Sequence, residues 1–144
     1  MRNFGKTKVL LIGNVIIWGI VLFFFIQSII FQKSFLKANE QLVHEFTSYQ
    51  TYNEYLSRKE YLSKKMTPSV LSQVCPIIQV DNQKKEEQLQ VTNVKTTNYS
   101  FEDSKITLLV SFKLESSVAK SELTMRQIYT KKEGKWLMSH YNYI

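Results

Sequence analysis

The sequence predicts an α+β protein: one N-terminal transmembrane helix, then about three helices packed on a four-stranded antiparallel sheet. Three observations predict this class. The chain opens with an apolar run that lacks ionisable side chains, helical periodicity follows it, and a period of two dominates the second half. We therefore expect three parts, which are a cytoplasmic tail (1–8), a transmembrane helix (9–31) and an extracytoplasmic α+β domain (32–144).

The apolar run extends from Val9, through Asn14 and Trp18, to Phe31. A helix of this length spans roughly 34 Å, which is enough to cross a hydrocarbon core of about 30 Å. The run is longer than the apolar region of a secretory signal, about 7–15 residues, and no A-x-A cleavage pattern follows it. We expect a retained membrane helix, with a cleaved signal as the alternative.

The charges beside the run predict its orientation. Arg2, Lys6 and Lys8 precede it without an acidic neighbour, and only Lys33 and Lys37 follow it closely. The positive-inside rule then places the N-terminus in the cytoplasm and the C-terminal domain outside the cell membrane. The helix between them is expected to contact membrane lipid. The net charge is +7, but the sequence has no arginine cluster or basic-aromatic strip, so we expect no direct sequence-specific nucleic-acid binding.

Asn14 is a polar residue inside the apolar run. It follows Gly13, where another helix can approach closely, and an interhelical hydrogen bond contributes on the order of 0.6–2 kcal/mol. One interpretation is therefore that Asn14 helps a homo-oligomer to form. The other is that Asn14 lies near the headgroups and bonds water.

Residues 34–49 carry apolar side chains at helical intervals, and no glycine or proline separates them from the apolar run. One long helix is expected here, or two helices with a small break near residues 32–34. A capping box at Thr51–Glu54 starts the next helix, and Thr67 with Pro68 starts the third.

The second half of the chain predicts an antiparallel meander without any parallel pair. A polar loop at 81–88 precedes four runs rich in β-formers, joined by short connections. These runs are residues 89–101, 106–114, 122–130 and 136–144. Val110, Phe112, Trp136 and Met138 are expected in the core, although a slip of one residue in the last strand would bury Leu137, Tyr141 and Tyr143 instead.

The sequence shows no catalytic, metal-binding or cofactor-binding constellation, so we expect no enzyme and no cofactor. His44 and His140 are its only histidines, and neither belongs to a ligand pattern. The single cysteine, Cys75, lies among apolar residues and predicts a buried inert thiol. Glu102 and Asp103 are interpreted as turn residues.

The order of elements, with the Met66-Thr67-Pro68 turn and the Gly134-Lys135-Trp136 hairpin, resembles the cone-shaped fold of the nuclear transport factor and ketosteroid isomerase superfamily. With its anchor, the layout is similar to the bitopic assembly subunit of type IV secretion systems, the eighth component of the Vir B set. It is also similar to the conjugative relatives of that subunit in Gram-positive bacteria. The resemblance implies a non-enzymatic scaffold that oligomerises, contacts other channel proteins and helps to build a channel for plasmid or protein transfer.

Two alternatives remain. A pseudopilin-like subunit also joins an apolar helix to an antiparallel sheet, but here Leu10 stands where such proteins carry Glu after the Gly5 leader. An anchored domain that binds a small ligand in its cone is the second alternative. That function needs a polar group inside a pocket, and His140 is the candidate base.

Overall fold

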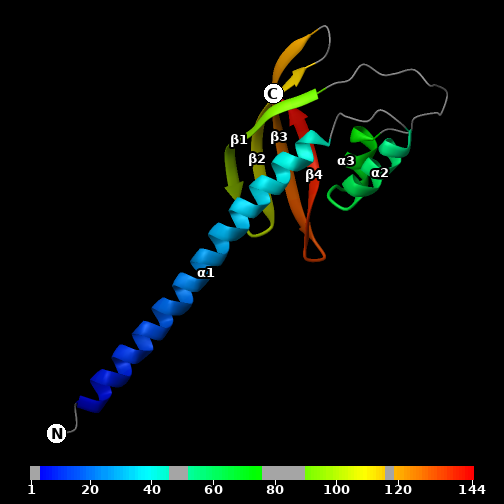
Figure 1. The fold of residues 1–144 in the computed structure, drawn as a ribbon. Coiled ribbons are helices and arrows are strands. Elements are labelled where there is room, and N and C mark those ends of the chain that lie inside the picture. Colours follow the sequence, from blue (N-terminus) through cyan, green and yellow to red (C-terminus); the bar gives the residue numbers. More distant parts are fainter. Residues whose placement is uncertain (1–3, 46–51, 76–89, 116–118) are drawn as a thin grey trace. The chain divides into compact units, whose positions relative to one another are not determined.

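The computed structural model describes residues 4–45, 52–75, 90–115 and 119–144 (Figure 1). It shows an α+β protein with a long N-terminal apolar helix, two shorter helices and a four-stranded antiparallel sheet, which confirms the predicted class. The chain forms two compact units, Met1–Lys37 and Ala38–Ile144.

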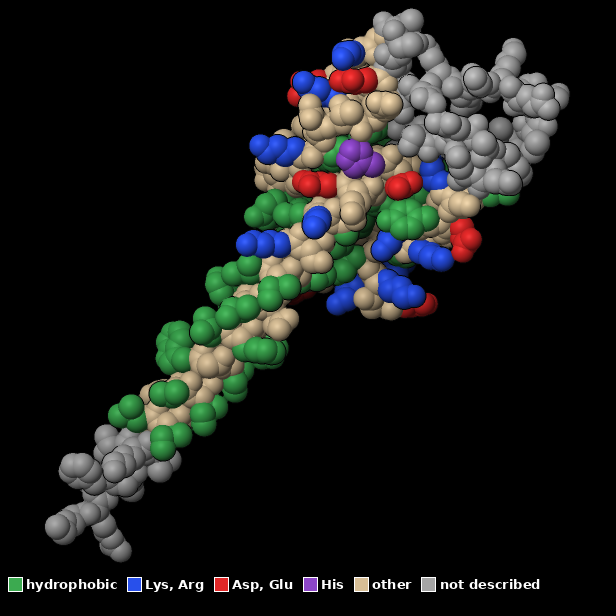
Figure 2. Space-filling view, viewed as in Figure 1, with side chains coloured by type: hydrophobic (Ala, Val, Ile, Leu, Met, Phe, Trp, Pro, Cys, Tyr) green, Lys and Arg blue, Asp and Glu red, His purple; other side chains and the backbone are tan. Residues whose placement is uncertain are grey.

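Helix α1 (Phe4–His44) combines the apolar run and the first helix of the domain in one element. No glycine or proline interrupts the sequence from Ile20 to His44, so nothing in this stretch breaks the helical hydrogen bonds. The expectation of one long helix is therefore confirmed. In the first unit apolar side chains cover α1 on the side seen in Figure 2, and the helix is long and apolar enough to cross a membrane.

Helix α2 (Tyr52–Ser63) and helix α3 (Pro68–Val74) lie together beside the last strand (Figure 1). Thr67 is the N-cap of α3, as expected, but its side chain makes no capping hydrogen bond. Its backbone N–H instead donates to the carbonyl of Met138 at 2.9 Å. The first residue of the predicted capping box, Thr51, and the predicted loop at 81–88 lie outside the described residues.

The sheet has the order β1-β2-β3-β4, and every neighbouring pair is antiparallel. The strands are β1 (Gln90–Phe101), β2 (Lys105–Glu115), β3 (Lys120–Lys132) and β4 (Lys135–Tyr143). The expected absence of a parallel pair holds within this sheet. Outside it, Met66 forms an isolated parallel bridge with Met138, because the chain between α2 and α3 runs along the outer edge of β4.

An irregularity in β4 decides which residues of this strand face the helices. Met138 lies opposite Tyr129 and His140 lies opposite Ile128, so Ser139 is one residue too many on its strand. A bulge of this kind changes the phase of the alternation. Met138 before the bulge and Tyr141 after it therefore share one face. The sequence had offered these two residues as alternatives in different registers, and the bulge lets both face the helices.

The core lies between this face of the sheet and the helices. Val110 (0% exposed), Phe112 (4%) and Met138 (0%) are buried in it. The helices contribute the buried apolar side chains of Leu42, Val43, Leu62 and Val70 to the same core, and the segment between α2 and α3 contributes Met66. Trp136 differs from the expectation, because it is only half-buried, with Lys131 Nζ 5.9 Å from the centre of its ring.

Candidate functional site

The first candidate site is the apolar surface of α1. Val9, Asn14, Trp18 and Phe31 all lie on this helix, and the side chains of the last three are exposed. Trp18 is 71% exposed and Phe31 is 43% exposed, so neither contributes to a core within the chain. Lys6 and Lys8 also lie on α1, whereas Arg2 is outside the described residues.

Three polar side chains interrupt this apolar surface, and all three are exposed: Asn14, Gln27 and Ser28. A bilayer would offer no water to such groups, so within one their hydrogen-bonding atoms would need partners in protein or near the headgroups. These three side chains are therefore the positions on the α1 surface where specific hydrogen bonds to another molecule can form.

The second candidate site is a polar cluster buried beneath α1. The hydroxyl of Tyr129, on β3, donates a short hydrogen bond to Asn39 Oδ1, on α1. Burial raises the pKa of Tyr129 above its ordinary value of 10.0, and the nearby Tyr61 raises it further. Because the phenol stays neutral, it acts here as a hydrogen-bond donor.

Gln127 is the next inward residue of β3 and is fully buried. Its Nε2 makes only a long contact of 4.0 Å with Met125 Sδ. Within the described part of the chain, Gln127 Oε1 and Asn39 Nδ2 are buried without a hydrogen-bond partner. Each of these groups is costly to leave unpaired in a core, and a bound water beside it would satisfy it.

Two further side chains of α1 hold strand β1. Glu40 Oε1 accepts a hydrogen bond from the backbone N–H of Thr96 at 3.1 Å. His44 Nδ1 donates to the carbonyl of Val91 at 3.0 Å. These contacts satisfy backbone groups at an edge strand, which stabilises the sheet and protects it from pairing with other chains.

The structure does not bring the two histidines together. His44 contacts β1, whereas His140 is exposed on β4. Cys75 is 1% exposed, and burial raises the pKa of its thiol although Arg58 opposes that shift. A protonated, inaccessible thiol is a poor nucleophile and a poor metal ligand.

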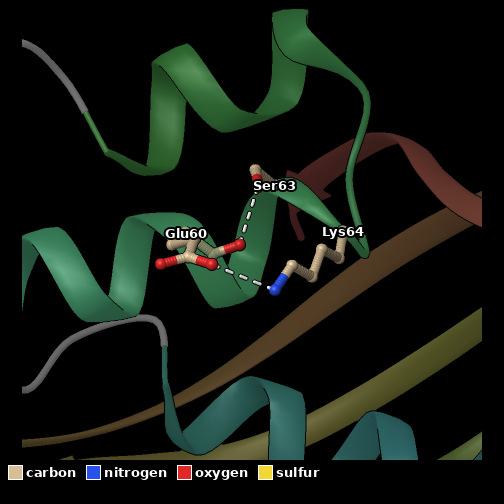
Figure 3. A network of polar contacts seen from close by, with 3 residues as sticks. All are labelled: Glu60, Ser63 and Lys64. Carbon is tan, nitrogen blue, oxygen red and sulfur yellow. Dashed lines mark hydrogen bonds and ion pairs between the residues drawn. The ribbon is translucent and has the colours of Figure 1, made fainter.

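Glu102 and Glu60 make hydrogen bonds that hold local structure. The N–H of Glu102 donates to the carbonyl of Lys105 at 2.9 Å in the turn between β1 and β2. Glu60 accepts from Lys64 Nζ at 3.1 Å, and its carbonyl accepts from Ser63 at 2.7 Å (Figure 3). Such exposed i,i+4 pairs contribute about 0.3–0.5 kcal/mol and close the last turn of α2. Over the described residues, no group of three or more potential ligands could hold a metal ion.

Sequence reasoning missed the cluster of Asn39, Gln127 and Tyr129. A signal for two of them was present, because Met125, Gln127 and Tyr129 alternate along one strand and share its inward face. Asn39 gives no such signal, since an asparagine in an amphipathic helix is usually exposed.

No family model matches the chain, and no curated protein matches it.

Proposed function

We propose that this chain is a non-enzymatic scaffold, anchored in the cell membrane, that helps to assemble a type IV secretion or conjugative transfer channel. Its N-terminus lies in the cytoplasm and its α+β domain lies outside. The observation that carries the proposal is α1, one helix that is apolar enough to cross a membrane and ends in the core of an α+β domain. An anchor that is continuous with a folded domain suits a protein that holds other proteins at a membrane.

The arrangement of polar groups agrees with this proposal. Glu40 and His44 are engaged with the backbone of β1, and the Cys75 thiol is buried. Their hydrogen bonds and burial hold the domain together. A scaffold acts through its surface, and the exposed apolar residues of α1 supply one such surface.

Cross-linking in the membranes of the cell that makes the protein tests the proposal. Full-length protein is cross-linked, extracted in mild detergent, and its partners are identified by mass spectrometry. We expect oligomers together with channel proteins such as the transfer ATPase or the coupling protein. A strictly monomeric chain without channel proteins would contradict the scaffold and favour an anchored ligand-binding domain.

The second candidate function, an anchored ligand-binding domain, is favoured by one observation. Gln127 Oε1 and Asn39 Nδ2 are a buried acceptor and a buried donor without a partner in the described part of the chain. A small polar ligand that bonds to these groups would raise the thermal stability of the protein, because it binds only the folded state. Replacing Gln127 with Leu would abolish that shift, whereas Gln73→Leu, at an exposed position of α3, would preserve it.

A further inference from the structure

The depth of the polar side chains along α1 distinguishes Gln27 from Asn14. The apolar run from Val9 to Phe31 is centred on Ile20. At 1.5 Å per residue, the backbone of Gln27 lies about 10 Å from the centre and that of Asn14 about 9 Å on the other side. Both are inside a hydrocarbon core whose half-thickness is about 15 Å.

Their side chains lean in opposite senses relative to the bilayer. In an α-helix each Cα–Cβ bond tilts toward the helix N-terminus. For Asn14 that direction leads toward the nearer membrane surface, about 6 Å from its backbone. For Gln27 it leads toward the bilayer centre, where lipid provides no hydrogen-bond partner. Gln27 is therefore the amide that needs a protein partner.

The residues at seven-residue intervals from Gln27 suit close helix packing. Ile20 and Gly13 precede Gln27 at this spacing, and each residue of this series is displaced by only about 20° around the helix from the next. Ile20 is 52% exposed, and a Cβ added at Gly13 would meet no atom within 4 Å. Gly13, Ile20 and Gln27 thus form an open strip along the helix. Around the helix axis, Gln27 lies about 140° from Asn14.

We propose that this strip is the contact between the transmembrane helices of two copies of this chain. This contact rests on the proposed function only for the membrane insertion of α1. All copies insert in one orientation because they carry the same flanking charges, so a pair of helices is parallel and Gln27 faces Gln27 at the same depth. A primary amide is both donor and acceptor, so two identical amides satisfy each other across a two-fold axis.

Disulfide cross-linking of the full-length protein in membranes locates the contact. Ile20→Cys lies on the strip, and Leu22→Cys is a matched control at nearly the same depth, about 160° around the helix. The wild type, whose only thiol is the buried Cys75, sets the background. We expect a disulfide dimer from Ile20→Cys alone. Equal dimer from both variants, dimer from Leu22→Cys alone, or none from either would overturn the proposal.

Energy transfer between full-length proteins in liposomes, labelled at Ser104→Cys, measures the association constant. We expect Gln27→Leu to lower it about 8- to 900-fold, the loss of two reciprocal interhelical hydrogen bonds per dimer. Asn14→Leu, the same change on another face, is expected to leave it unchanged. A loss with Asn14→Leu as large as with Gln27→Leu would overturn the assignment to Gln27.

The two proposals fail separately. If Ile20→Cys does not cross-link while the protein still co-purifies with channel proteins, the contact is wrong and the scaffold remains. If Ile20→Cys cross-links but deletion of the gene leaves transfer intact, the contact stands and the scaffold role fails.

Discussion

At the scale of single residues, the hydrogen bond from Tyr129 to Asn39 joins the end of α1 to the middle of the sheet. Both residues are buried, at 3% exposure each, so water cannot replace the bond when it is removed. A buried acceptor left without its donor costs about 1–3 kcal/mol. This pair therefore contributes more than an exposed hydrogen bond would.

We expect Tyr129→Phe to lower the free energy of unfolding by about 1–3 kcal/mol, because Asn39 Oδ1 loses its donor. Thermal unfolding of the full-length protein in detergent measures the change. The control is Tyr99→Phe, which alters a side chain that is 52% exposed and should shift stability by less than about 0.5 kcal/mol. Equal effects from both variants would show that the Tyr129 bond contributes little.

The pH dependence of stability follows from the same residue. Burial raises the pKa of Tyr129 in the folded state, so the folded protein holds its proton more tightly than the unfolded chain does. The stability that this shift contributes is fully present below about pH 10, the unfolded pKa, and is lost as the pH rises above it. We expect a shallower fall for Tyr129→Phe. A part of the fall should persist, since burial also raises the pKa of Tyr141 and Tyr143.

The turn between β3 and β4 carries strain at one residue. Glu133 has φ 48° and Gly134 has φ 78°, the pair of positive values that a tight two-residue hairpin turn requires. Glycine accepts this conformation readily, but glutamate does not. We expect Glu133→Asn to raise stability by about 0.5–1 kcal/mol. Glu133→Gln removes the same charge without relieving the strain, so a gain from that variant would contradict this explanation.

At the scale of elements, β2 is the part of the sheet that sequence predicts best. Ile106, Leu108, Val110 and Phe112 alternate with less buried residues, so the period of two identifies both the strand and its buried face. The last strand was harder to predict, because the extra residue at Ser139 changes the phase of the alternation and leaves no local signal. The bridge from Met66 to Met138 depends on packing between distant segments, which no local pattern reports.

Substitutions in β4 test this corrected view of the strand. Met138 is fully buried, so Met138→Ala should cost about 2–5 kcal/mol by leaving a cavity. Trp136 is only half-buried, so Trp136→Ala should cost less, about 1–2 kcal/mol, despite the larger side chain that it removes. Urea unfolding of the two variants measures both values. A larger loss for Trp136→Ala would place that ring in the core after all.

At the scale of the whole molecule, the sequence predicted the α+β class and the long apolar helix from composition and periodicity alone. Alternation along β3 puts Gln127 and Tyr129 on one face, but which helix residue meets them could not be predicted, because that depends on packing in space. The proposed orientation in a membrane rests on the charges around the apolar run, and chemical labelling can measure it.

Labelling at Ser104→Cys measures the orientation, since this residue lies exposed in the turn between β1 and β2. We expect a membrane-impermeant maleimide to label it in intact cells, because the proposed topology has the domain outside. The buried Cys75 of the wild type should remain unlabelled. Labelling of Ser104→Cys only after lysis would reverse the topology.

The frequency of plasmid transfer, or of protein secretion, tests the central claim most directly. The gene is deleted in the cell that carries it and restored either as full length or with Ile16 and Phe23 in the span replaced by Asp, which opposes membrane insertion. The account predicts that deletion abolishes transfer, that the full-length protein restores it and that the charged-span variant does not. Normal transfer in the deletion strain would contradict the account.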